Sequence, residues 1–117
     1  MKINLLQNIM IIQLPECYDI ITMGEFFNIV KNKDQYNGVE YLIIDGSELK
    51  QFSEGIGEIM IVKNELNIKE IIFVNLPELI RIVFKITLNN SDDGDIVEFT
   101  NIDDAINYLN KIKLERN

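Results

Sequence analysis

Apolar residues along this chain fall into short continuous runs that alternate with stripes of helical period. The runs are rich in isoleucine and valine, which is typical of buried strands. The strands predicted in this way are residues 3–6, 9–14, 39–44, 71–74 and 95–99. The first two are separated by Gln7-Asn8 and are expected to pair as a hairpin, whereas the last one alternates and is typical of an edge strand.

Apolar residues between these runs recur at spacings of three and four, which predicts amphipathic helices. The expected helices are residues 22–37, 54–66, 76–86 and 102–109. Thr22 is the expected N-cap of the first helix. Its expected buried stripe comprises Met23, Phe26, Phe27 and Val30. The expected buried stripe of the third helix comprises Leu76, Leu79, Ile80, Val83 and Phe84.

Strands that alternate with helices indicate an α/β fold. We expect a mixed, mainly parallel sheet of four to five strands packed with about four helices, and an antiparallel N-terminal hairpin. The length of 117 residues fits a single domain, residues 1–117. Its core is expected to span about residues 8–109, followed by a frayed tail at residues 111–117.

Two helices carry more apolar residues than one buried stripe needs. Ile82 and Ile86 lie about a third of a turn from the main stripe of the third helix. The favoured interpretation is a wide face buried under the sheet, and the alternative is a patch that binds a partner or a second copy of the chain. The second helix is apolar round more than one face, so it is either deeply packed or partly an interface.

The charge and composition exclude several classes of function. A net charge of −8 argues against nucleic acid and anionic membranes as partners. No apolar stretch reaches the roughly 20 residues of a membrane span. The single cysteine, Cys17, suits a reducing cytoplasm, where we expect the protein to be located. The chain has no histidine, so it lacks the commonest metal ligand and general base, and we expect no enzyme, metal or cofactor.

Ser53 is the residue with the strongest functional signal. It lies where the second helix is expected to begin, beside Gly55. One interpretation is an ordinary N-cap. The other is a phosphoacceptor, because a helix start offers free N–H groups and a favourable dipole to a phosphate. Glu54 and Glu58 lie close in sequence and would repel that phosphate.

The pattern as a whole resembles the STAS domain, the fold of anti-sigma factor antagonists, from about residue 8 to residue 109. Asp19 and Thr22 match an acidic residue and a threonine in an early turn of that family, and the run that ends at Asp45 matches its central strand. The central motif Asp-Ser-Ser/Thr-Gly-Leu-Gly is matched by Phe52-Ser53-Glu54-Gly55-Ile56-Gly57. The segments 72–88 and 102–105 resemble later parts of the domain.

The resemblance implies a bacterial, non-enzymatic switch in transcription regulation. Such a protein binds a kinase-type anti-sigma factor, and phosphorylation of the matched serine, Ser53, switches that binding off. The expected partner is thus an anti-sigma factor or related serine kinase. The partner-binding residues implied are Asp19, Thr22, Asp45, Phe52, Ser53, Glu54, Gly55 and Ile56.

Three positions depart from the family pattern. Phe52 replaces an aspartate, Glu54 replaces a hydroxyl residue, and the glycine of a later Thr-Gly-Leu is absent between Thr87 and Leu88. These departures leave two alternatives open. One is an adaptor that docks a partner through the same loop without phosphorylation. The other is a small-ligand module, because some STAS relatives bind nucleotides or lipids.

Overall fold

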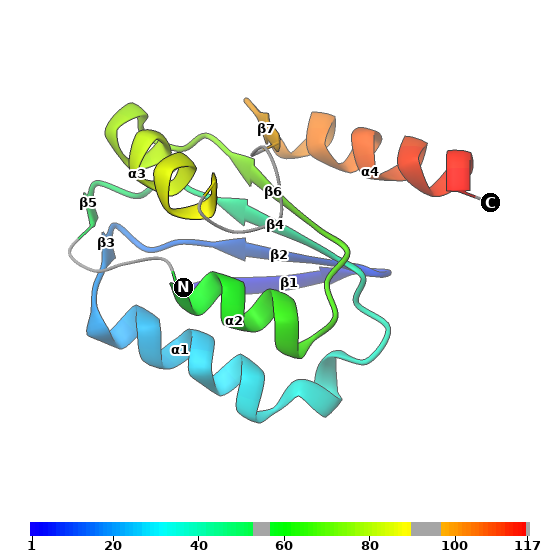
Figure 1. The fold of residues 1–117 in the computed structure, drawn as a ribbon, viewed down its shortest axis with the longest axis horizontal. Helices are drawn as coiled ribbons and strands as arrows, with labels where there is room; N and C mark the ends of the chain where they lie inside the picture. The colour runs from blue at the N-terminus through cyan, green and yellow to red at the C-terminus, as the bar shows by residue number, and fades with distance from the viewer. Residues whose placement is uncertain (53–56, 90–96, 117) are drawn as a thin grey trace.

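The chain forms a five-stranded sheet in the order β1-β2-β4-β6-β7 (Figure 1). The structure is a computed structural model that describes residues 1–52, 57–89 and 97–116. The strands are β1 (Lys2–Leu6), β2 (Ile9–Gln13), β4 (Tyr41–Asp45), β6 (Glu70–Val74) and β7 (Val97–Phe99). β1 pairs antiparallel with β2, and every other neighbouring pair is parallel. The predicted α/β fold, with its mainly parallel mixed sheet and N-terminal hairpin, is confirmed.

In the described residues, four α-helices cover the two faces of the sheet (Figure 1). They are α1 (Ile20–Lys31), α2 (Gly57–Glu65), α3 (Glu78–Asn89) and α4 (Ile102–Arg116). One core cluster joins the sheet to residues of α1, α2 and α3, and a second cluster joins the opposite face to α4. Both faces of the central strands are therefore buried, which explains why their sequences are continuous apolar runs.

The connections place three helix starts at one edge of the sheet. α1 follows β2, α2 follows β4 and α3 follows β6, and all three helices pack on the same face. The parallel strands run in the same direction, so their carboxyl ends lie at the same edge of the sheet. Each of these helices follows such a strand and therefore begins near that edge. Figure 1 shows α1 and α2 beginning on the side to which the arrowheads of β2, β4 and β6 point.

Two short strands were not predicted. β3 (Cys17–Tyr18) and β5 (Gln51–Phe52) form a separate parallel pair at this edge. Strands of two residues are too short to show a period in the sequence. Their pairing also depends on segments that lie far apart along the chain.

The first helix differs from its prediction at both ends. Its N-cap is Asp19 and not Thr22, because the Asp19 carboxylate accepts hydrogen bonds from the first turn. It ends at Lys31 and is followed by a 3₁₀-helix, η1 (Lys33–Tyr36). Thr22, Phe26 and Ile29 are buried, and Met23 and Val30 of the expected stripe are partly buried against the same core. Phe27, expected in the core, is 47% exposed.

The third helix buries fewer residues than expected. Ile80 and Phe84 are buried, and Phe84 packs edge-to-face on Phe73 of β6 with ring centroids 5.3 Å apart. Leu79 and Val83 were expected in the core, but they are exposed. The favoured interpretation of a wide buried face is therefore wrong, since Ile82 and Ile86 are exposed as well.

The remaining helix ends follow their local sequence. Asn67, with φ of 56°, lies just after α2 in the left-handed conformation that ends helices. α4 begins at Ile102, as expected, with Asn101 capping it through a hydrogen bond from Asp104 N to Asn101 Oδ1 of 2.8 Å. It continues beyond Leu109 to Arg116, where a frayed tail was expected.

Candidate functional site

The β3–β5 pair brings together two parts of the candidate site that lie far apart in sequence. Cys17 is in register with Gln51, and Tyr18 with Phe52. The backbone N–H groups of Lys50 and Gln51 also donate to the Glu16 carbonyl, at 2.7 and 3.0 Å. The chain just before Asp19 therefore lies beside the chain just before Ser53.

Asp19 holds the start of α1 at this edge. Its Oδ1 accepts hydrogen bonds from Ile21 N at 3.0 Å and Thr22 N at 3.3 Å. A carboxylate at a helix N-terminus is also favoured by the helix dipole. The two residues that follow this cap, Ile20 and Ile21, are 76% and 70% exposed.

Thr22 and Asp45 lie inside the protein. Thr22 is buried, and its hydroxyl donates to the Cys17 carbonyl at 3.3 Å, which ties α1 to β3. Asp45 is buried at the end of β4, where its Oδ1 accepts from Ser47 N at 3.0 Å. Both side chains hold the backbone of the edge in place, and neither offers a surface to a partner.

A buried polar pair joins β3 to α2. The Tyr18 hydroxyl donates to Glu58 Oε2 at 2.9 Å, and both residues are buried. Burial raises the pKa of Tyr18, and so do the hydrogen bond to Glu58 and the negative charge of that carboxylate. The phenol therefore stays protonated and remains a donor. This contact fixes the first turn of α2, close in sequence to Ser53, against the β3–β5 pair.

The centre of the predicted motif lies outside the described residues. This applies to Ser53, Glu54, Gly55 and Ile56. The backbone of Phe52 is described as part of β5. The structure therefore describes the chain on both sides of the motif, from Phe52 on one side and from Gly57 on the other.

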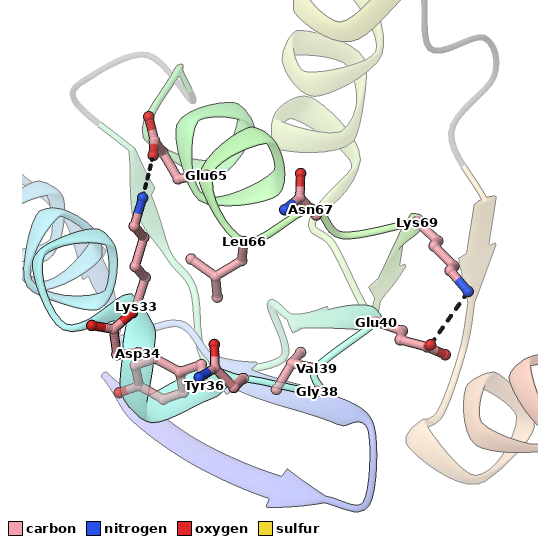
Figure 2. Close-up of a pocket in the computed structure, with 11 residues that line it drawn as sticks. Lys33, Asp34, Tyr36, Gly38, Val39, Glu40, Glu65, Leu66, Asn67 and Lys69 are labelled. Carbon is pink, nitrogen blue, oxygen red and sulfur yellow. Dashed lines mark hydrogen bonds and ion pairs between the residues drawn. The ribbon is translucent and has the colours of Figure 1, made fainter.

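A cavity of about 420 Å³ lies at the opposite edge of the sheet (Figure 2). Residues that directly precede β4 and β6 line it, among them Glu40 and Lys69. Lys33 pairs with Glu65, and Lys69 with Glu40, each at 3.3 Å. Both lysines of the lining are thus neutralised by glutamates of the same lining, so the cavity offers little attraction to a phosphate group.

The described residues include no cluster of three or more potential metal-ligating side chains. Among the described helices, none combines the length and apolar character needed to cross a bilayer. Cys17 is a half-buried free thiol of β3.

No family model matches this sequence, and neither does any curated protein sequence.

The sequence interpretation missed two features of this edge, the Tyr18–Glu58 contact and the exposed pair Ile20 and Ile21. Tyr18 and Glu58 are separated by 40 positions, so no local pattern links them. Glu58 is nonetheless an acidic residue within an otherwise apolar stretch of α2, which is a signal for a buried partner. The adjacent isoleucines Ile20 and Ile21 precede the predicted helix start, and the structure places both in the exposed first turn of α1.

Proposed function

We propose that this protein is a non-enzymatic interaction switch resembling an anti-sigma factor antagonist. It binds a kinase-type anti-sigma factor through the edge formed by the β3–β5 pair and the starts of α1 and α2. Phosphorylation of Ser53 switches this binding off. The parallel pairing of β3 with β5 is the observation that carries the proposal, because it joins the Asp19 turn to the segment that leads into Ser53.

The chemistry of the described edge supports a protein partner. Ile20 and Ile21 are adjacent and highly exposed, and exposed apolar side chains beside polar ones are common in protein interfaces. The Asp19 cap and the Tyr18–Glu58 hydrogen bond also hold the described starts of both helices in place. A preformed surface loses less entropy on binding.

The electrostatics support an off-switch. A phosphoserine adds about −1.5 to −2 charges at neutral pH. The chain already carries a net charge of −8, and the buried Glu58 lies in the first turn of α2. A phosphate on Ser53 would therefore raise the cost of desolvating this edge against a partner, so binding should weaken.

The test uses purified anti-sigma kinases from the same genome as this gene. Wild-type protein is incubated with each kinase and ATP, and phosphate is located by mass spectrometry. Binding of wild-type, Ser53→Ala and Ser53→Asp proteins is measured by calorimetry. We expect one kinase to phosphorylate Ser53 and to lose affinity at least tenfold for Ser53→Asp, while Ser53→Ala still binds.

Matched controls separate this site from general charge effects. Ser47 is an exposed serine in the turn after β4, so Ser47→Asp adds the same charge away from the motif and should bind normally. Ile21→Glu should abolish binding, whereas Ile61→Glu, at an exposed isoleucine of α2, should not. The proposal fails if no kinase binds, or if Ser53→Asp binds as tightly as wild type.

The constitutive adaptor remains a second candidate because Phe52 and Glu54 stand where the family carries an aspartate and a hydroxyl residue. A partner that binds through Ile21 but never phosphorylates Ser53 would favour the adaptor over the switch.

A further inference from the structure

The outer face of α3 carries an uninterrupted apolar stripe. It consists of Leu79, Ile82, Val83 and Ile86, which are 78%, 46%, 43% and 62% exposed. Their spacing of three, four and seven residues places them on one side of the helix. The face that contacts the sheet is a different one, formed by Ile80 and Phe84. α3 is therefore apolar on two sides, and among the described residues only one of these sides is packed against the rest of the protein.

We infer that this α3 stripe is the interface of a homodimer, in which α3 packs antiparallel against α3 of a second copy. This inference goes beyond the proposed function, since it uses a surface separate from Ile20, Ile21 and Ser53. Such a pair is related by a two-fold axis, so the same stripe serves both copies.

The charges beside the α3 stripe complement each other in this arrangement. Glu78 and Lys85 lie two helical turns apart, on the same flank of the stripe. In the antiparallel dimer, the two-fold axis is perpendicular to both α3 helices. The flank that carries Glu78 and Lys85 then lies on the same side of the dimer in both copies, but the two helices run in opposite directions. Glu78 of each copy therefore faces Lys85 of the other, and the pair forms twice. The third charged residue of α3, Arg81, is already paired with Glu98 of β7 at 3.6 Å.

The overall charge makes α3 a favourable place for two copies to meet. The chain carries a net charge of −8, so two copies repel each other over most approaches. The sequence of α3 has two basic residues and one acidic residue, so approach through α3 avoids most of this repulsion. The same net charge disfavours an anionic membrane as the surface that covers the α3 stripe.

The area predicts a weak and reversible dimer. The stripe exposes on the order of 400 Å² per copy, within the range of the largest apolar patch on an ordinary monomer. A symmetric pair would bury about 800 Å² from the two stripes, and the aliphatic parts of Glu78, Arg81 and Lys85 would add to this area. A standard stable interface buries roughly 1,600 Å². Association should therefore depend on concentration and should strengthen with salt, which screens the net repulsion.

The experiment is sedimentation equilibrium of the whole chain from about 10 μM to about 1 mM, at low and moderate salt. We expect a monomer–dimer equilibrium for the wild type. Ile82→Glu should weaken it at least tenfold, because each dimer would bury two unpaired carboxylates. The matched control Leu5→Glu adds the same charge at an exposed residue of β1 and should dimerise like the wild type.

Charge reversal tests the antiparallel geometry. Glu78→Lys and Lys85→Glu should each weaken the dimer, although they change the net charge in opposite directions. The double variant restores opposite charges across the two-fold axis and should recover wild-type affinity. A wild type that stays monomeric at about 1 mM, or a dimer unaffected by Ile82→Glu, overturns the inference. A double variant as weak as the single variants overturns the antiparallel arrangement.

Discussion

The hydroxyl of Tyr18 in β3 donates a 2.9 Å hydrogen bond to the carboxylate of Glu58 in the first turn of α2. Both residues are buried, and the contact joins segments separated by 40 positions. A buried hydrogen bond to a charged acceptor is stronger than a neutral one, and removing one partner leaves the other desolvated. The pair therefore holds α2 against the β3–β5 pair, next to the segment that contains Ser53.

Removing the Tyr18 hydroxyl should destabilise the protein without changing its fold. Tyr18→Phe keeps the ring, which packs 5.9 Å from the ring of Phe26, but it deprives the buried Glu58 carboxylate of this donor. We expect a loss of about 1–3 kcal/mol in the free energy of unfolding, measured by urea denaturation. Tyr36→Phe, at a half-buried tyrosine of η1, is the control and should change stability by less than about 0.5 kcal/mol. Equal effects of the two variants would contradict this role of the pair.

The same contact predicts a loss of stability at high pH. The folded protein raises the pKa of Tyr18 above its ordinary value of about 10, so the unfolded chain loses this proton first. The stabilisation is therefore fully present below about pH 10 and decreases as pH rises further, by at most about 1.4 kcal/mol per pH unit.

Comparison of the wild type with Tyr18→Phe isolates this effect from other tyrosines and lysines. The stability advantage of the wild type should shrink between about pH 10 and pH 12 in urea unfolding curves. An advantage that stays constant over this range would show that Tyr18 ionises normally in the folded state.

The N-cap of α1 should contribute measurably to stability. Asp19→Ala removes the acceptor for the Ile21 and Thr22 N–H groups, and we expect a loss of about 0.5–2 kcal/mol. Asp19→Asn keeps a side-chain oxygen and should lose much less. Thermal unfolding followed by circular dichroism would measure both. If Asp19→Ala is as stable as wild type, another group caps this helix.

The two apolar faces of α3 should respond differently to truncation. Phe84→Ala removes a buried ring that packs on Phe73, and we expect a loss of about 3–5 kcal/mol. Leu79→Ala changes a side chain that is 78% exposed, so the stability of the dilute monomer should change by less than about 0.5 kcal/mol. Denaturant unfolding at low protein concentration measures both. A large loss for Leu79→Ala would mean that Leu79 is buried in solution.

The pattern of apolar runs was sufficient to predict the sheet. Every residue of β4 is buried, and a strand covered on both faces needs apolar side chains at consecutive positions. The signal is local, so the run itself identifies the strand. A helix between two such runs then implies that the two strands are parallel, because parallel neighbours need a long crossover connection, which is usually a helix.

Local pattern was not sufficient for the helix faces. The spacing of apolar residues identifies α3 as a helix, but the helix has two apolar sides. Only the packing on Phe73 decides that Ile80 and Phe84 are the buried residues. In α1, hydrogen bonds to the Asp19 side chain place the helix start before Thr22, and the packing of the helix on the sheet leaves Phe27 exposed.

The sequence by itself determined the α/β class, the sheet and the approximate helices, because strand burial and helix period are properties of neighbouring residues. The tertiary structure alone decided that β3 pairs with β5, that Tyr18 meets Glu58, and that the α3 stripe stays uncovered. Those contacts join residues far apart in the chain, and their formation depends on how the whole sheet and its helices are arranged in space.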